Sequence, residues 1–229
     1  MLVSTIIPAF NAERTIVQAI ESALAQRYNS HEIVVVNDGS TDATAEILER
    51  YRGRLRIVNQ ENRGAAAARN AGIEHSNGEY LAFLDSDDLF LPKKLAVMTA
   101  ALRRSPAASL AFSEYGFIDE SGTEYRESAI GDASSMAALI RKRPFPVASL
   151  SAFIYPSTWL VPRRVLARTG GFSEAFKGAG YEDSWLLLLL RELGDFVHVP
   201  EKLTLYRETH ASAVADKYGP GLSVFVDMV

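Results

Sequence analysis

The first half of the chain predicts an α/β fold built on a doubly wound, mostly parallel sheet. Short runs rich in β-branched residues recur there, and each is separated from the next by a segment long enough for one helix. Residues 33–36 read Ile-Val-Val-Val without polar alternation, which is typical of a central parallel strand covered on both faces. The expected strands are residues 2–7, 32–36, 55–58 and 80–84.

The segments between these strands carry helical signals. Apolar side chains in residues 15–26 follow the spacing of a helix that packs on a sheet, at Ile16, Ala19, Ile20, Ala23 and Leu24. Residues 43–51 follow a turn, 38–42, whose Ser, Thr and Asp residues are natural helix N-caps. A third helix, made of small residues, follows Gly64 and carries the cation Arg69.

From about Pro92 the pattern changes to that of an α+β extension. Helices are expected over residues 93–104, 134–142 and 183–193, with another beginning at Arg163. Apolar runs at 109–118 and 158–161 and predicted strands at 196–199 and 203–206 complete this half. No linker is long or polar enough to mark a boundary, so we expect residues 1–229 to form a single domain.

The composition excludes several classes of protein. With 24 Lys+Arg against 28 Asp+Glu the net charge is −4, so we expect no nucleic-acid partner and no polybasic membrane adhesion. The absence of cysteine excludes disulfides, a thiol nucleophile and thiolate zinc sites. The 48% of hydrophobic residues is typical of an ordinary globular chain that can bury a core.

The sequence predicts a protein without a transmembrane segment. Its longest apolar run, residues 185–190, is far shorter than the roughly 20 residues of a membrane-spanning helix. The N-terminus lacks the basic region and cleavage site of a secretory signal, so we expect a cytoplasmic protein. Basic residues 141–143 leave peripheral contact at the inner membrane face open, although a solvated helix end is the simpler interpretation.

Three polar clusters follow predicted strands, at residues 8–11, 37–40 and 85–88. In doubly wound sheets, ligands bind beyond the carboxyl ends of the strands, so these clusters mark the expected site. The chain contains neither the Gly-x-Gly-x-x-Gly fingerprint nor a Walker A sequence, which argues against a nicotinamide enzyme and a P-loop ATPase.

Asp85-Ser86-Asp87-Asp88 places three carboxylates within four residues at the end of an apolar strand. Mg²⁺ and Mn²⁺ take oxygen ligands and commonly bridge one or two carboxylates to substrate phosphates. A solvated loop whose aspartates cap the next helix is the alternative interpretation. The position of the cluster beside two other polar strand ends favours a metal.

Three further residues each have a functional and a structural interpretation. Asp38 can accept a hydrogen bond from a base or a ribose hydroxyl, or it can belong to a simple turn. Phe10 can stack on a base, although a phenylalanine near a strand end more often lies in the core. Arg69 is either a surface residue or a planar clamp for phosphate.

Taken in order, these motifs resemble the series found in family 2 glycosyltransferases, which have the GT-A fold. The resemblance rests on residues 3–11, 35–42, 64–72 and 83–88. Later segments are similar to further motifs of that family: Gly170-Gly171-Phe172, residues 180–183, and Tyr206-Arg207-x-x-His210. The resemblance covers most of the chain and is weakest between Ser105 and Ser157.

The resemblance implies inverting transfer of a sugar from a nucleoside diphosphate to an acceptor hydroxyl. It places a nucleotide-binding half at residues 1–95 and an acceptor-side half at 96–229. The implied nucleotide-binding residues are Pro8, Ala9, Phe10, Asn11, Asp38, Arg69, Asp85 and Ser86. The implied cofactor is Mn²⁺ or Mg²⁺, held by Asp87 and His210, although His210 alone reads equally well as a surface or hydrogen-bonded histidine. The implied catalytic pair is Glu182 and Asp183, with Asp183 as the general base; alone, Asp183 would read as a helix cap.

Departures from the family pattern refine this expectation. Polymerising members of the family usually carry membrane spans and a Gln-x-x-Arg-Trp motif, and the chain has neither, which favours non-processive addition of single sugars. We expect a UDP-sugar donor, with guanine and thymine nucleotides left open. The expected acceptor is a saccharide or a lipid-linked saccharide, in the synthesis of cell-surface polysaccharide or glycolipid.

Three rival functions fit the same motifs. Transfer to polyprenyl phosphate would need no general base, because a phosphate acceptor is already ionised. A nucleotide-sugar binding module would bind the donor without turnover. A nucleotidyltransferase would use similar metal chemistry but would release pyrophosphate.

Overall fold

A computed structural model of the chain describes residues 1–127, 154–176 and 181–208. The helix expected at residues 134–142, the basic residues 141–143 and His210 lie outside the described residues. Within the described part, no helix is long and apolar enough to cross a membrane.

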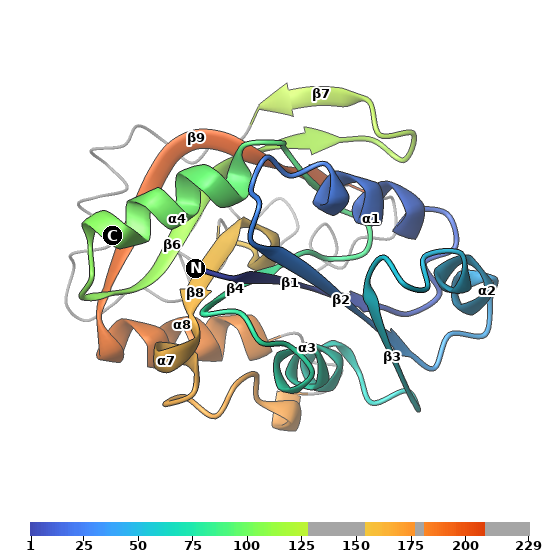
Figure 1. The fold of residues 1–229 in the computed structure, drawn as a ribbon, viewed down its shortest axis with the longest axis horizontal. Coiled ribbons are helices and arrows are strands. Elements are labelled where there is room, and N and C mark those ends of the chain that lie inside the picture. Colours follow the sequence, from blue (N-terminus) through green and yellow to red (C-terminus); the bar gives the residue numbers. More distant parts are fainter. Residues whose placement is uncertain (128–153, 177–180, 209–229) are drawn as a thin grey trace, which may run out of the picture.

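The described strands form one nine-stranded sheet (Figure 1). Its order is β3-β2-β1-β4-β8-β6-β9-β5, and β7 pairs with β6. The strands are β1 (Val3–Ala9), β2 (His31–Asp38), β3 (Arg56–Gln60), β4 (Tyr80–Phe83), β5 (Leu89–Phe90), β6 (Ala108–Ile118), β7 (Glu124–Glu127), β8 (Trp159–Pro162) and β9 (Asp195–Arg207).

The first four strands pair in parallel, as their sequences predict. β1 lies between β2 and β4, with Val3 opposite both His31 and Tyr80, and β3 flanks β2. The carboxyl ends of these strands therefore lie at one edge of the sheet. In the second half β8 runs antiparallel to β4 and β6, whereas β9 runs parallel to β6, which makes an α+β extension of a parallel sheet.

Helices cover both faces of the sheet. Figure 1 shows α1 and α4 above it and α3, α7 and α8 below it. The helices are α1 (Ile16–Leu24), α2 (Thr44–Glu49), α3 (Ala65–Glu74), α4 (Lys94–Arg104), α7 (Arg163–Leu166) and α8 (Glu182–Leu193), with 3₁₀ turns η1 (Pro156–Thr158) and η2 (Glu174–Phe176).

Neighbouring residues of β1 point into two different cores, because side chains alternate across a strand. Ile7 belongs to the core under α1 and α4, together with Ile16 and Met98. Ile6 belongs to the core between the sheet and α8, together with Leu187. All seven residues of β1 are buried, which explains why its sequence is nearly continuous in apolar residues.

The sequence predicts two strands at residues 196–199 and 203–206, and this prediction is wrong in one respect: β9 is one continuous strand. The register against β6 shifts between Ser113 and Glu114. Ser113 pairs with Val199 and Glu114 with Lys202, so the two residues of β9 between them have no partner on β6. Pro200 lies in that interval, and it has no N–H to donate. The proline interrupts the pairing without ending the strand.

Candidate functional site

The ends of β1 and β2 are joined by hydrogen bonds. Asn11 has a positive φ of 49°, and its Oδ1 accepts the backbone N–H of Thr41 at 2.8 Å. The Asn11 backbone N–H in turn donates to Ser40 Oγ at 3.1 Å. Asn11 therefore fixes the loop that follows β2. Phe10 is 49% exposed, so its ring faces outward at this edge rather than lying in the core.

Asp38 is buried and holds the segment that leads into α3. Its Oδ1 accepts the Arg63 N–H at 2.9 Å and Gln60 Nε2 at 2.7 Å, and its Oδ2 accepts the Gly64 N–H at 2.8 Å. This is a structural role, but not the one in the turn at residues 38–42 that the sequence suggests, because its partners lie at residues 60–64. A carboxylate has about four acceptor positions, so these three bonds leave room for a ligand donor.

Arg69 connects three elements. Its Nη2 lies 2.7 Å from Asp85 Oδ1, at the end of β4, and its Nη1 lies 3.4 Å from Glu182 Oε1, at the start of α8. The guanidinium also lies 5.2 Å from the centre of the Phe172 ring. Burial opposes its charge, but the neighbouring carboxylates outweigh burial and raise the pKa of Arg69. Arg69 is therefore neither a surface residue nor free of protein partners.

Asp183 lies in the first turn of α8. Its Oδ1 accepts the Ser184 backbone N–H at 2.6 Å and Ser184 Oγ at 3.3 Å. Burial raises the pKa of Asp183, and the Ser184 hydrogen bond and Arg69 only partly oppose this effect. The result is a half-buried carboxyl group with increased basicity, next to a buried cation.

The turn at residues 85–88 is held at both ends. Asp85 N–H donates to Ser157 Oγ at 3.0 Å, and Asp88 N–H donates to the Asp85 carbonyl at 3.1 Å. Asp88 Oδ1 accepts the Arg207 N–H at 2.9 Å, while Asp88 Oδ2 is buried without a partner in the described structure. Burial raises the pKa of Asp87 to about 6, and raises that of Asp88 well above its usual range.

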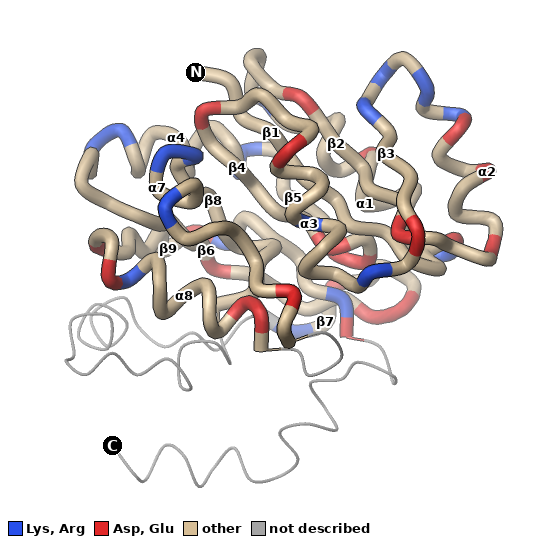
Figure 2. Tube along the Cα trace, turned by 90° about the horizontal axis from the view of Figure 1, so that it is seen from below, with Lys and Arg blue, Asp and Glu red and all other residues tan. Residues whose placement is uncertain are grey.

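These residues make one connected polar site at the carboxyl edge of the sheet. Three carboxylates follow β4, a buried arginine joins Asp85 to α8, and a second acidic pair begins α8. Figure 2 shows acidic segments at the start of α8 and beside β7 toward the bottom of the view, with basic segments beside α4 and α7 higher up.

Comparison with models of protein families shows which family the chain belongs to. The family described as "Glycosyl transferase family 2" matches residues 4–170. The chain belongs to glycosyltransferase family 2.

Relatives in this family are longer than the chain or align with part of it. An uncharacterized glycosyltransferase of Rickettsia felis is 32% identical over 191 residues, which are 82% of this chain and 31% of the relative. Glycosyltransferase GlyG of Streptococcus pneumoniae is 26% identical over an alignment that covers 95% of this chain and 74% of the length of GlyG. Chondroitin synthase of Escherichia coli is 29% identical over an alignment that covers 94% of this chain and 30% of the length of the synthase.

Solved structures of S. aureus TarS share the fold. The structure of TarS residues 1–349 in complex with UDP gives a TM-score of 0.70 at 23% identity, covering 91% of this chain and 61% of TarS 1–349. The complex with UDP-GlcNAc gives 0.71 at 19% identity, with 94% and 61% covered. The likeness confirms the predicted GT-A fold class, an α/β fold with a curled, mostly parallel sheet.

Family 2 implies a divalent cation, and the turn at residues 85–88 fits one in part. Among the described residues, no group of three or more His, Cys, Asp or Glu side chains is arranged to hold a metal. Mg²⁺ needs only one or two carboxylates when substrate phosphates supply further oxygens. Asp87 offers a half-buried carboxylate, and Asp88 contributes a buried oxygen without a partner in the described part. The donor set is therefore suited to a hard cation shared with a ligand.

Of the remaining predicted residues, Pro8 and Ala9 are buried at the end of β1, and Ser86 lies half-buried beside Asp87. The structure brings the strand-end residues, Arg69 and the Glu182–Asp183 pair to one edge of the sheet. It does not place His210, which lies outside the described residues.

Two buried cations beside the site have no strong sequence signal. Lys94 Nζ lies 3.0 Å from Thr204 Oγ1, and burial lowers the pKa of Lys94 to about 7. In the sequence Lys94 follows Lys93, and two adjacent lysines indicate an exposed position and not a buried one. Arg207 is 1% exposed and contacts the turn at 85–88. In the sequence Arg207 stands within Tyr206-Arg207-x-x-His210, which resembles a family motif, but nothing there indicates that it is buried.

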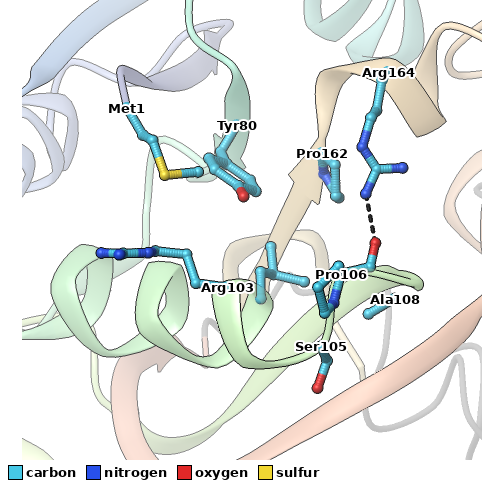
Figure 3. A pocket seen from close by; sticks show the side chains of 9 residues that line it. Met1, Tyr80, Arg103, Ser105, Pro106, Ala108, Pro162 and Arg164 are labelled. Carbon is cyan, nitrogen blue, oxygen red and sulfur yellow. Dashed lines mark hydrogen bonds between the residues drawn. The ribbon is translucent and has the colours of Figure 1, made fainter.

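A hollow of about 280 Å³ lies elsewhere, at the opposite edge of the sheet (Figure 3). Its lining includes Tyr80, at the start of β4, together with Pro162 and Arg103. Arg164 closes one side by donating to the Pro106 carbonyl at 2.7 Å. Since the polar site follows the carboxyl end of β4, this hollow does not belong to it.

Proposed function

We propose that the chain is a glycosyltransferase domain that transfers a single sugar, with inversion, from a nucleoside diphosphate sugar to an acceptor hydroxyl. One observation carries the proposal: Arg69 joins the carboxylate turn after β4 to the acidic start of α8 within a family 2 fold. A donor site and a base on a separate element are what a direct displacement requires, because the acceptor attacks from the face opposite the leaving group.

UDP is the proposed nucleotide. TarS, which shares this fold, has been solved with UDP and with UDP-GlcNAc. On this chain the base and ribose would lie against Pro8, Ala9, Phe10 and Asn11 at the end of β1, with Asp38, Asp85 and Ser86 beside them. The exposed ring of Phe10 can stack on uracil, and Asp38 retains an acceptor position for a base N–H.

Asp183 is the proposed general base. Its Oδ1 is held by Ser184, and its second oxygen can take the acceptor proton. The raised pKa improves the match between this carboxyl group and a hydroxyl acceptor. Glu182 keeps its ion pair with Arg69, so we assign it the role of holding the start of α8 in place.

Asp87 is the proposed protein ligand of Mn²⁺ or Mg²⁺, and His210 remains a second predicted ligand. When bound, such a cation stabilises the negative charge that develops on the departing diphosphate. Arg69 lies next to Asp85 and favours an anionic ligand at the same edge.

The remaining expectations stay part of this proposal. Residues 1–229 form one domain, with a nucleotide-binding half at 1–95 and an acceptor-side half at 96–229. The acceptor is a saccharide or a lipid-linked saccharide of cell-surface polysaccharide or glycolipid, and the protein acts in the cytoplasm or at the inner membrane face. The presence of chondroitin synthase among the relatives supports a polysaccharide setting.

The test is incubation of the chain with UDP-hexoses and Mn²⁺ while free UDP is measured. Release of UDP that increases on adding a saccharide acceptor supports the proposal. Binding without any release would identify a nucleotide-sugar binding module instead. Pyrophosphate formed from a nucleoside triphosphate and a sugar phosphate would identify a nucleotidyltransferase.

A further inference from the structure

Arg207, the last residue of β9, is a buried hydrogen-bonding centre beneath the carboxylate turn. Its Nε donates to the Asp87 carbonyl at 2.7 Å, and its Nη2 donates to Gln18 Oε1 on α1 at 2.6 Å. Its Nη1 donates to the carbonyls of Asp119 and Glu120, at 2.7 and 3.0 Å, in the turn between β6 and β7. One side chain therefore ties three separate elements to the end of β9.

The choice of partners is informative. A buried guanidinium is usually neutralised by a carboxylate with which it shares hydrogen bonds, because removing the charge from water is costly. Arg207 instead directs its side-chain donors at three backbone carbonyls and one amide. Its contact with Asp87 is thus to the backbone, which leaves the Asp87 carboxylate available for another ligand.

The backbone of Arg207 holds the next residue of the same turn. Its N–H donates to Asp88 Oδ1 at 2.9 Å, so Asp87 and Asp88 are both fixed by this one residue. Two adjacent residues held in this way have little freedom to rotate. The backbone of Asp87, and with it the point from which its side chain leaves the turn, is then set before any ligand binds.

We propose that Arg207 is a positioning residue that orients the Asp87 carboxylate toward the diphosphate of the donor and its divalent cation. This rests on the proposed function, because it assumes that Asp87 contacts the cation. Groups that orient a metal ligand from behind typically change metal affinity by roughly 10- to 100-fold when they are replaced. A lysine at this position would keep the charge but could not reproduce the planar fork of donors.

The experiment compares UDP affinity with Mn²⁺ and with EDTA by calorimetry, in the full chain and in R207K. The ratio of the two affinities measures the metal-dependent part of binding. We expect R207K to reduce this ratio roughly tenfold or more. Affinity in EDTA should change by less than about twofold, since the groups around the base are not altered.

R191K is the matched control. Arg191 is also a buried arginine, and its Nη1 donates to the Gly194 carbonyl at 3.0 Å and to Asp195 Oδ1 at 2.8 Å, near the end of α8. The R191K variant should lose stability as R207K does, but its ratio of UDP affinity with Mn²⁺ to UDP affinity with EDTA should stay at the wild-type value. A folded R207K protein with the wild-type ratio would overturn the proposal, as would an equal loss in R191K.

A milder variant keeps the test decisive if R207K does not fold. Gln18 is exposed, so Q18L removes one acceptor of Arg207 without opening the core. A reduced ratio in Q18L supports the proposal, and an unchanged ratio overturns it. If the unaltered chain binds UDP with no effect of Mn²⁺, the inference fails together with the metal role proposed for Asp87, while the proposed sugar transfer from a UDP donor still stands. If it does not bind UDP at all, the proposed function fails.

Discussion

Glu182 and Asp183 are neighbours in sequence, but their surroundings suit them to different tasks. The Glu182 carboxylate forms an ion pair with Arg69, which occupies it as a proton acceptor. Asp183 accepts hydrogen bonds only from Ser184 among the described side chains and backbone groups, and burial raises its pKa. At the scale of single residues, this difference in hydrogen-bond partners is our reason for proposing Asp183, and not Glu182, as the base.

Replacing Asp183 with asparagine should therefore remove catalysis and leave binding intact. We expect D183N to lower the rate of UDP-sugar turnover by about 10²- to 10⁴-fold, the usual contribution of a general base. Its UDP affinity, measured by calorimetry, should remain within about twofold of the unaltered chain. Turnover retained to within a few-fold would contradict the assignment and favour a phosphate acceptor.

Replacing Asp38 with asparagine should lower both the stability of the fold and the affinity for UDP. It is 2% exposed and accepts three hydrogen bonds, from Gln60, Arg63 and Gly64. D38N places an amide donor among these donors, so urea denaturation should show an unfolding free energy lower by about 1–3 kcal/mol. UDP affinity should fall too.

The control for Asp38 is D42N. Asp42 also accepts backbone N–H groups, from Glu13 and Thr44, but in an exposed loop. Its loss should lower the unfolding free energy by less than about 1 kcal/mol. Equal stability of D38N and the unaltered chain would show that Asp38 serves the ligand alone.

At the scale of elements, α3 packs unusually close to β1. A Cβ added to Gly72 would meet Ile6 Cγ2 in the core at less than any normal contact distance. Overpacking of this kind lowers stability by about 1–3 kcal/mol. The small residues of α3 are thus a requirement of its contact with the sheet.

G72A tests this packing. Alanine favours a helix over glycine by about 1 kcal/mol, so a helix without the contact would become more stable. We expect the opposite, a melting temperature lower by several degrees in a thermal scan. A65G, at an exposed position of the same helix, measures the helix preference by itself. An increase in the melting temperature of G72A would contradict the packing account.

The sequence predicts an element well when its signal is local. The four strands and two helices of the first half follow from the periods of their apolar residues, and the structure has them in place. β5 has two residues, Leu89 and Phe90, and exists because it pairs with β9, more than a hundred residues away. No local pattern identifies a strand of that length.

The same limit applies to the site. The polar strand ends are visible in sequence because they stop apolar runs, and the topology of the sheet brings them together. The partners of Arg69 and Arg207 are not visible, since Glu182 lies 113 residues from Arg69 and Asp87 lies 120 residues from Arg207. Only the fold shows that Arg69 pairs with two carboxylates and that Arg207 donates to the backbone of the turn at residues 85–88.

At the scale of the whole molecule, protonation links stability to pH. Burial lowers the pKa of His31 to about 4, although Glu32 partly opposes the effect, and His31 Nε2 lies 2.8 Å from Thr5 Oγ1. The folded protein therefore binds this proton less readily than the unfolded chain does. The stability that the neutral ring contributes is complete above about pH 6.5 and is lost as pH falls toward 4.

H31Q should make the fold less sensitive to acid. Between pH 7.5 and pH 5 we expect the unaltered chain to lose about 2 kcal/mol more unfolding free energy than H31Q, from a pKa difference between about 6.5 and 4. Urea titrations at both pH values provide the measurement. H75Q, at an exposed histidine, is the control, and an equal loss in all three proteins would contradict the expected effect.

In the proposed account, the fold brings the carboxylate turn at residues 85–88 to the edge of the sheet where the parallel strands end. Asp87 is central to that account, because burial raises its pKa to about 6 and a cation would relieve the burial of its charge. D87A should not lower the stability of the ligand-free chain at neutral pH, since it removes a buried charge.

Calorimetric titration of UDP with and without Mn²⁺, in the unaltered chain and in D87A, is the most direct measurement. The account predicts that Mn²⁺ tightens UDP binding in the unaltered chain and has no such effect in D87A. An Mn²⁺-dependent affinity that is the same in both proteins would contradict it.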